Sequence, residues 1–351
     1  METKKHLYYL DNLRVALNTL VIAHHVGQAY GPTGGWWPIQ ETARAAILGP
    51  FFTVNRSFFM SLFFMISGYF AVMSCDAKGP RAFTKDRALR LGLPALVFGL
   101  IMIPMHLFVF SGPAWPIDVG HLWFLEHLLI FSACYALLQA IQKPRNANEQ
   151  KQADPPGYVT ILVFTFLLAV ASAVIRIWYP IDKWVYILGF IRVAFADVPR
   201  DLSFFVIGIL AYRGQWFSRF PTKAGYIWLC VGLILAGLWY AYALALRNIF
   251  PINDTVMGIL YPIWESFLCC GMCIGLTVWF REKFDLQGRL GNTLAKSQYA
   301  AYIFHVPAVI LFQFLILGLA VPPFVKFTVV TLLSVPATFW FSNRLRKPMG
   351  L

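Results

Sequence analysis

Long apolar stretches separated by short polar connections run through this chain. A run of about twenty apolar residues is long enough to cross the hydrocarbon core of a membrane as a helix. Such runs begin near Leu13, Ser57, Arg90, His121, Tyr158, Arg200, Gly225, Met257, Gln298 and Pro322. The pattern predicts an all-α integral membrane protein, a polytopic bundle of about ten transmembrane helices in one domain, residues 1–351. Boundaries around 179–213 stay open, because the sixth run is short and follows a broken apolar stretch.

Composition and charge agree with this class. Hydrophobic residues make up 59% of the chain and charged residues only 13%, so no water-soluble fold could bury the apolar surface. Lys and Arg concentrate in alternate short loops, and the positive-inside rule places those loops and both termini in the cytoplasm. This bias accounts for the net charge of +13, and we find no nucleic-acid-binding motif. The six cysteines lie in or at the ends of spans, which argues against a disulfide framework, and no metal site is expected.

The first predicted span carries one polar stripe. Arg14 and His25 are eleven residues apart, and at about 100° per residue this offset returns to within roughly 20° of the same face. Asn18 and Gln28 fall near that face, whereas His24 lies about 80° away from it. With a rise of about 1.5 Å per residue, His25 lies roughly 16 Å beyond Arg14, in the outer half of the membrane. Such buried ionisable groups are usually functional, although snorkelling of Arg14 and simple packing of His25 are the alternatives.

The same counting places two later histidines, and His121 belongs at a depth similar to that of His25. His121 opens the fourth span from the outside, where an interfacial packing role and a functional role both fit. Glu126 lies about 140° around the helix from His121, so the two face one site only if the helix begins irregularly. His305 lies near mid-membrane in the ninth span, with Tyr302 one turn before it and the helix-bending Pro307 after it.

Arg87 and Arg90 lie at i and i+3 where the third span enters from the cytoplasm. Two guanidinium groups on one helix face can bind phosphates through paired hydrogen bonds. Ordinary positive-inside anchoring is the alternative explanation and fits equally well.

Five motifs follow one another in the order found in a known family. They are Asp11-x-x-Arg14-x10-His25, Phe63–Tyr69, Arg87-x-x-Arg90 with Pro94, His121–Leu125 and Tyr302–Pro307. With these motifs the chain resembles the membrane acyltransferase 3 family over residues 7 to about 130 and 297 to 312, whereas residues 140–296 match in hydropathy alone. Within that family it most resembles the branch that succinylates periplasmic glucans.

The resemblance implies an O-acyltransferase that moves an acetyl or succinyl group from cytoplasmic acyl-coenzyme A to a hydroxyl of an extracytoplasmic glycan. Acyl-coenzyme A would be a co-substrate, with no permanently bound cofactor. His25 is implied as general base or transient acyl carrier, and the other catalytic roles fall to Arg14 and His121. The implied donor-binding residues are Arg14, Ser67, Arg87 and Arg90, and the implied acceptor-binding residues are His121, Glu126, Tyr302 and His305. Ser67 would bond the donor thioester or another helix, and Gly68 allows helices to approach closely.

The implied location is the bacterial cytoplasmic membrane. The implied partners are acyl-coenzyme A, the hydroxyl acceptor and membrane lipid, with a partner acyltransferase protein because we expect no extracytoplasmic hydrolase-like domain. Two other interpretations stay open at this point. One is a multi-span solute transporter without acyl transfer chemistry, and the other is a different membrane O-acyltransferase fold centred on His305.

Overall fold

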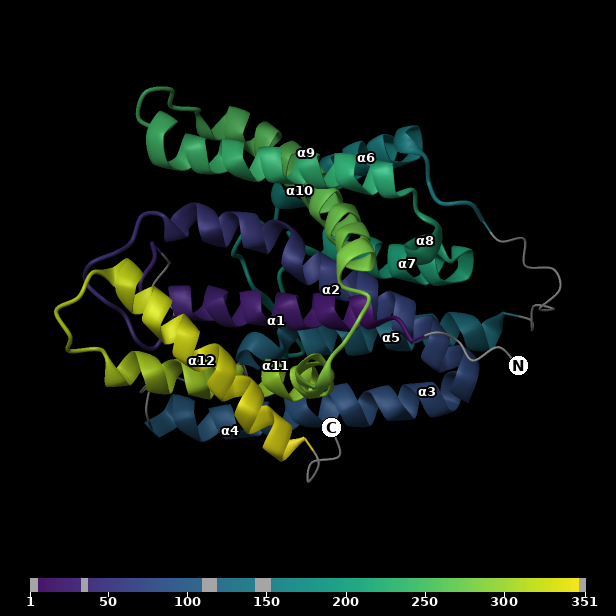
Figure 1. Ribbon diagram of the computed structural model, residues 1–351, viewed down its shortest axis with the longest axis horizontal. Helices are drawn as coiled ribbons and strands as arrows, with labels where there is room; N and C mark the ends of the chain where they lie inside the picture. Colours follow the sequence, from purple (N-terminus) through teal and green to yellow (C-terminus); the bar gives the residue numbers. More distant parts are fainter. Residues whose placement is uncertain (1–5, 33–36, 109–118, 143–152, 347–351) are drawn as a thin grey trace. The chain divides into compact units, whose positions relative to one another are not determined.

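The computed structural model describes residues 6–32, 37–108, 119–142 and 153–346, with backbone alone for 102–108. Each of the ten predicted spans lies on a helix. These helices are α1 (Tyr8–Gly27), α2 (Leu48–Lys78), α4 (Leu93–Phe108), α5 (Trp123–Ile141), α6 (Tyr158–Arg176), α7 (Val198–Gly214), α9 (Thr222–Ala241), α10 (Asp254–Lys283), α11 (Arg289–Leu315) and α12 (Pro323–Leu345) (Figure 1). Two short helices, α3 (Pro80–Arg87) and α8 (Trp216–Arg219), lie between them in the sequence.

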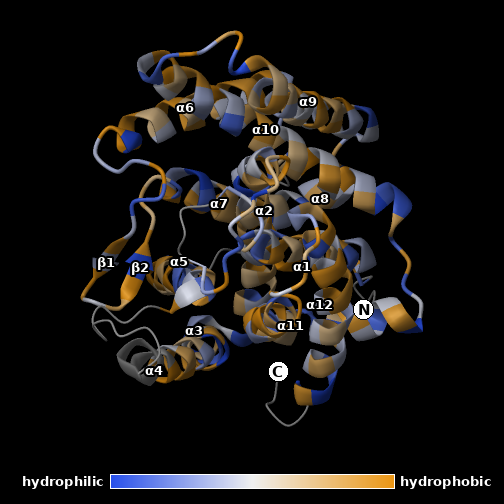
Figure 2. Cartoon of the chain, turned by 90° about the vertical axis from the view of Figure 1, so that its left-hand side faces the viewer, coloured by the Kyte–Doolittle hydropathy of each residue, from blue (hydrophilic) through white to orange (hydrophobic). Residues whose placement is uncertain are grey.

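Seven helical segments within the described residues are long and apolar enough to cross a membrane. They contain α2, α5, α6, α9, α10, α11 and α12. Of the other three predicted spans, α4 and α7 have 16 and 17 residues, and α1 carries Asp11 and Arg14. Hydrophobic residues run along the helices, and hydrophilic residues lie mostly near helix ends and in connections (Figure 2). The protein is therefore a mostly helical, multi-pass membrane protein.

The chain is not helical throughout. Strands β1 (Val185–Ile187) and β2 (Ile191–Val193) form an antiparallel hairpin in the region whose boundaries the sequence left open. Leu188 and Gly189 both adopt positive φ in its turn, as tight hairpin connections require. The broken apolar pattern of this stretch therefore reflects a short hairpin between α6 and α7.

The structure comprises two compact units, which we describe separately. Unit 1 contains Met1–Phe59, Pro221–Leu260 and Phe267–Leu351, and unit 2 contains Met60–Phe220 and Tyr261–Ser266. Helices α2 and α10 contribute residues to both units. The expectation of a single domain stays a prediction.

In unit 1, α1, α11 and α12 pack against one another (Figure 1). Their shared core includes Ile22, Val26, Ala301, Val309 and Val330, which are all almost completely buried. Lipid is as apolar as these side chains, so removal from water contributes little to their association inside a membrane. Close packing and hydrogen bonds between helices therefore hold this part of unit 1 together.

Helices α1 and α11 run parallel. Asn18 Nδ2 donates a hydrogen bond to the carbonyl oxygen of Gln298 (3.0 Å), and His25 Nδ1 lies 3.2 Å from His305 Nε2. Both pairs are separated by 280 residues in the sequence. The two contacts are therefore about two helical turns apart on both α1 and α11 and occur in the same order along each helix. The two helices thus begin at the same end of unit 1.

Glycines allow α2 and α7 to approach closely in unit 2. A β-carbon on Gly68 would lie 2.1 Å from the carbonyl oxygen of Phe205, and one on Gly208 would lie 2.0 Å from that of Met65. No side chain fits at either position, because both distances are far below van der Waals contact. The expected packing role of Gly68 is confirmed.

A buried network of ion pairs joins α6, α7 and α10 within unit 2. Glu265 binds two arginines: Oε1 lies 2.7 Å from Arg200 Nη1, and Oε2 lies 2.6 Å from Arg176 Nη2. Asp197 and Asp201 place two further carboxylates 3.3 and 3.4 Å from the Arg200 guanidinium. An unpaired charge is costly at such depth, so these contacts explain why Glu265 is tolerated inside an apolar helix.

Candidate active site

Arg14 lies in the second turn of α1 and pairs with Asp11, one turn earlier on the same helix. Asp11 also accepts a hydrogen bond from His6 Nε2 (2.6 Å). Each charge of the Asp11–Arg14 pair compensates the other at the start of an apolar helix. This pairing gives a physical reason for the spacing in the first motif.

His25 and His305 form a hydrogen-bonded pair of imidazoles in unit 1. His25 Nδ1 lies 2.9 Å from the carbonyl oxygen of Val21, and His305 Nδ1 lies 2.7 Å from that of Tyr302. A carbonyl oxygen only accepts, so both Nδ1 atoms carry the proton in the neutral rings. His305 Nε2 then accepts a hydrogen bond from His25 Nδ1 at 3.2 Å. The lone pair of neutral His25 therefore lies on Nε2, the atom suited to act as base or nucleophile.

The two histidines differ in exposure. His305 is completely buried at 0%, whereas His25 is partly exposed. Tyr302 is also buried, and its ring centroid lies 5.9 Å from that of His305. His25 is therefore the more exposed member of the pair.

Trp37 and Gln313 frame the histidine pair. The Trp37 ring centroid lies 5.6 Å from that of His25, and its Nε1 donates to Gln313 Oε1 at 2.7 Å. Gln313 Nε2 in turn donates to the carbonyl oxygen of Val26 at 3.0 Å. Trp37 and Gln313 are buried, so this chain of contacts ties the segment after α1 to α11 beside His25. The sequence did not single out either residue, because the contact joins positions 276 residues apart.

His24 lies among aromatic side chains. Its ring centroid lies 5.1 Å from Phe52, 5.2 Å from Phe59 and 6.3 Å from Phe51. These contacts give His24 a packing environment that differs from the carbonyl and imidazole contacts of His25.

His121, Glu126 and Ser67 belong to unit 2. Helix α5 does begin irregularly, with a 3-10 turn at Gly120–Leu122, and the buried His121 packs edge-on against Phe98 at 5.2 Å. Glu126 Oε2 accepts a hydrogen bond from the backbone N–H of Arg192 (3.2 Å), which holds β2 against α5. Ser67 is partly exposed on α2, in the turn that approaches α7.

A π-helical turn at Ala88–Gly92 contains Arg90 and directly follows Arg87. The N–H of Leu93 reaches back to the carbonyl of Ala88 instead of continuing the regular pattern. Pro94, the next residue, has no N–H to donate, which favours such an interruption. The i, i+3 spacing predicted that the two arginines share one face of a regular α-helix. Because of the π-helical turn, they do not.

Each of these arginines contacts a side chain one turn earlier. The Arg87 guanidinium lies 5.2 Å from the centroid of the Phe83 ring, and Arg90 Nε donates to Asp86 Oδ1 at 3.0 Å. Asp86 also accepts a hydrogen bond from Lys78 Nζ at 3.0 Å. Partial burial alone would raise the pKa of Asp86, but the bond from Lys78 and the positive charge of Arg90 outweigh it and lower that pKa. Asp86 is therefore ionised at neutral pH and competes with a phosphate for Arg90.

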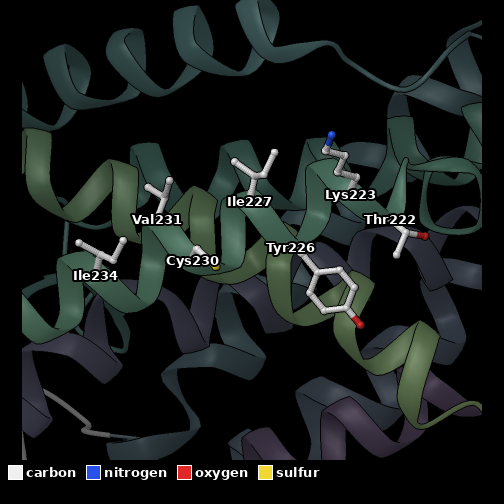
Figure 3. Close-up of a pocket in the computed structure, with 7 residues that line it drawn as sticks. All are labelled: Thr222, Lys223, Tyr226, Ile227, Cys230, Val231 and Ile234. Carbon is white, nitrogen blue, oxygen red and sulfur yellow. The ribbon is translucent and has the colours of Figure 1, made fainter.

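An apolar groove of about 620 Å³ lies along α9 in unit 1 (Figure 3). Its lining residues are Thr222, Lys223, Tyr226, Ile227, Cys230, Val231 and Ile234. None of the predicted site residues lines it, and inside a membrane such a helix face meets lipid. In the described part of the chain, no group of three or more His, Cys, Asp or Glu is placed to hold a metal ion.

Comparison with known proteins gives a family. A model of the acyltransferase 3 family, described as an acyltransferase domain, matches residues 7–343. Proteins named glucans biosynthesis protein C from Salmonella typhi and Salmonella typhimurium are each 27% identical to this chain over 239 residues. That match covers 62% of this chain and 61% of each relative, so the chain spans about three fifths of their length. The protein of the same name from Shigella dysenteriae is 27% identical over 229 residues, 58% of each chain. No solved structure matches this chain.

Proposed function

Because the chain belongs to the membrane acyltransferase 3 family, we propose that it transfers an acyl group, acetyl or succinyl, from cytoplasmic acyl-coenzyme A to a hydroxyl of an extracytoplasmic glycan. The name of its relatives, glucans biosynthesis protein C, supports a glucan as the acceptor. The multi-pass helical structure supports a reaction carried out within a membrane.

One observation carries the proposal: the orientation of the histidine pair. His25 Nδ1 faces Val21 and His305, which leaves the lone pair on Nε2. An imidazole with one nitrogen fixed as donor and the other basic is the arrangement used for general base and nucleophilic catalysis. The complete burial of His305 favours His25 over His305 as the reacting histidine.

The reaction can be written through His25 in either of two ways. As general base, Nε2 removes the proton of the acceptor hydroxyl while the oxygen attacks the thioester carbonyl, and the imidazolium then protonates the departing thiolate of coenzyme A. As acyl carrier, Nε2 attacks the thioester carbonyl, the C–S bond breaks and the thiolate of coenzyme A leaves. The acceptor hydroxyl then attacks the acyl carbon, the C–N bond to Nε2 breaks, and the hydroxyl proton neutralises the thiolate. In both forms the acceptor hydroxyl proton ends on the thiol of coenzyme A and His25 returns to its starting state, while the His305 Nε2 lone pair supports the proton on His25 Nδ1.

The resemblance to the family supplies the remaining proposed roles. Arg87, Arg90 and Arg14 bind donor phosphate or carbonyl charge, and Ser67 bonds the donor thioester. His121 meets the acceptor or the oxyanion that develops on the thioester carbonyl. The acceptor-binding roles of Glu126, Tyr302 and His305 stay predictions, and Tyr302 and His305 are buried in the structure. Acyl-coenzyme A acts as a co-substrate in this scheme, and a partner acyltransferase protein completes transfer.

The proposed topology has ten spans, both termini in the cytoplasm and the bacterial cytoplasmic membrane as location. The parallel course of α1 and α11 supports it, because two helices that begin on the same side are separated by an even number of crossings. With ten spans, eight crossings separate their starting points. The alternation of basic loops supports the same orientation.

Sealed inside-out vesicles test the proposal, since their outer surface is the cytoplasmic face. Radiolabelled acyl-coenzyme A is supplied outside, and a glucan oligosaccharide is trapped inside. We expect labelled ester on the trapped glucan while neither coenzyme A nor glucan crosses, and vesicles with His25→Ala should form none.

Two other outcomes contradict the proposal. Accumulation of unmodified solute driven by an ion gradient, with no ester, would mean a transporter. Ester formed only when donor and glucan are both on the cytoplasmic side would mean that His25 is not in the outer half of the membrane.

A further inference from the structure

Asn18 carries a buried polar atom that no described residue satisfies. The residue is 4% exposed, and its Nδ2 donates to the carbonyl oxygen of Gln298 at 3.0 Å. A carbonyl oxygen only accepts, so this contact fixes the amide orientation and identifies the other atom as Oδ1. Among the described residues, Asn18 Oδ1 has no hydrogen-bond partner. A buried acceptor without a donor destabilises a protein, so a site that keeps one is suited to a ligand that donates.

Asn18 lies between Arg14 and His25 along α1. Asn18 follows Arg14 by four residues and precedes His25 by seven, so it lies roughly 40° and 20° from their faces. Along the helix axis it lies roughly 10 Å before His25, on the side of Arg14. In the proposed function the donor phosphates lie at the cytoplasmic end and the thioester reaches His25, so the donor passes the level of Asn18.

The pantetheine arm of acyl-coenzyme A has hydrogen-bond donors at the matching distance. It contains two amide groups, and the second joins β-alanine to pantoic acid. Seven covalent bonds separate the thioester sulfur from the nitrogen of this second amide, a span of roughly 9 Å in an extended chain. With the thioester at His25, the second amide N–H lies at the level of Asn18.

We propose that Asn18 Oδ1 accepts a hydrogen bond from the second amide N–H of the pantetheine arm. The inference rests on the proposed function, because it takes acyl-coenzyme A as the donor. Asn18 then binds the donor and fixes how far the thioester extends toward His25. The contact also satisfies the buried acceptor that the helix pair α1–α11 leaves open.

Three thioester donors test this contact on the full-length protein in detergent, with a glucan oligosaccharide as acceptor. Acyl-pantetheine has both amides. Its analogue with an ester in place of the second amide lacks only that N–H, and acyl-N-acetylcysteamine ends after the first amide. We expect the wild-type protein to prefer acyl-pantetheine over the ester analogue by roughly fivefold to tenfold in kcat/KM, the range for one neutral hydrogen bond.

Asn18→Leu should lose that preference. We expect its KM for acyl-pantetheine to rise roughly fivefold to tenfold, with little change for the ester analogue or acyl-N-acetylcysteamine. Thr19→Val is the matched control, because the Thr19 hydroxyl binds the Val15 carbonyl of its own helix at 3.0 Å. Asn18→Ala provides the same comparison if the leucine variant does not insert.

Equal losses with all three donors would make Asn18 a packing residue and overturn the inference. A wild-type protein that does not distinguish acyl-pantetheine from its ester analogue would overturn it too, without any variant. If the wild type transfers acyl groups neither from these three donors nor from acyl-coenzyme A, the proposed function itself fails. These patterns separate failure of the contact from failure of the reaction.

Discussion

His25 Nδ1 lies 3.2 Å from His305 Nε2, and the two imidazoles are the side chains of two parallel helices. A hydrolase triad usually places a carboxylate behind its histidine, whereas here a neutral imidazole accepts the Nδ1 proton. A neutral partner avoids a second buried charge inside a membrane. It orients His25 through hydrogen bonding alone, and the carbonyl of Tyr302 orients the partner.

This relationship predicts that His25 and its neighbour are not interchangeable. We expect His25→Ala to abolish acyl transfer, because no other nitrogen carries the lone pair at that position. His24→Ala should retain much of the activity, since His24 packs among Phe51, Phe52 and Phe59. Ester formation by both purified variants, after equal insertion is verified, measures the difference. The reverse pattern would refute the assignment of His25.

His305 should affect rate more than donor binding. Without its Nε2 the proton on His25 Nδ1 loses one hydrogen-bond acceptor and keeps the Val21 carbonyl, so we expect His305→Ala to lower kcat about 10- to 100-fold with little change in the donor KM. His305→Gln retains a carbonyl acceptor and should recover part of the loss. Rates measured from pH 5.5 to 9 should show an altered profile in the alanine variant. Complete loss in His305→Ala with full activity in His25→Ala would favour the fold centred on His305.

The positions of the helices could be predicted from the sequence better than the contacts between them. Each of the ten predicted runs lies on a helix of the described residues, and seven of these helical segments are long and apolar enough to cross a membrane, because a span is predicted from length and hydropathy alone. The hairpin at 185–193 was missed, since three-residue strands carry too few positions for a pattern. The sequence shows the spacing of Asp11 and Arg14, whereas the ion pair between them is seen only in the structure.

Long-range partners could not be read from periodicity. Glu265 required a partner at its depth, yet the sequence could not name Arg200 and Arg176, which lie on other helices. The partnership of His25 with His305 has the same origin, since 280 residues separate them. Helical periodicity gives the face of a residue and its depth, whereas the neighbour across the interface depends on how helices pack.

Gly68 offers a direct test of packing in unit 2. An added β-carbon would meet the carbonyl oxygen of Phe205 at 2.1 Å, so Gly68→Ala must separate α2 from α7. We expect a loss of at least about 2 kcal/mol in the free energy of unfolding. Gly237→Ala is the control, because a β-carbon there meets nothing within 4 Å and should leave stability unchanged or improved. Thermal unfolding of both detergent-purified variants compares them, and equal midpoints would contradict the close approach.

Asp86 predicts a pH dependence at acidic pH. The folded protein lowers the pKa of Asp86, so its contribution to stability is complete above the ordinary aspartate pKa of about 4 and is lost as pH falls through the lower value. We expect the difference in unfolding midpoint between the wild type and Asp86→Asn to be constant from about pH 5 to 7 and to shrink below about pH 4. The difference should be small, since the paired Lys78 and Arg90 side chains are exposed. A difference that grows as pH falls would contradict this sign.

The arginines around the π-helical turn separate donor binding from membrane anchoring. If Arg87 and Arg90 bind coenzyme A phosphates, replacing either by Gln should weaken donor affinity by about 1–3 kcal/mol, the range for charge-assisted hydrogen bonds. Lys should restore only part of the affinity, because an ammonium cannot form the paired hydrogen bonds of a guanidinium. Arg81→Gln is the matched control, as Arg81 is an exposed arginine of the same segment with no assigned role. Acyl-coenzyme A binding to detergent-purified protein measures each variant. Unchanged binding in Arg87→Gln and Arg90→Gln would leave both arginines as topology anchors, whereas an equal loss in Arg81→Gln would indicate a general effect of positive charge at this surface.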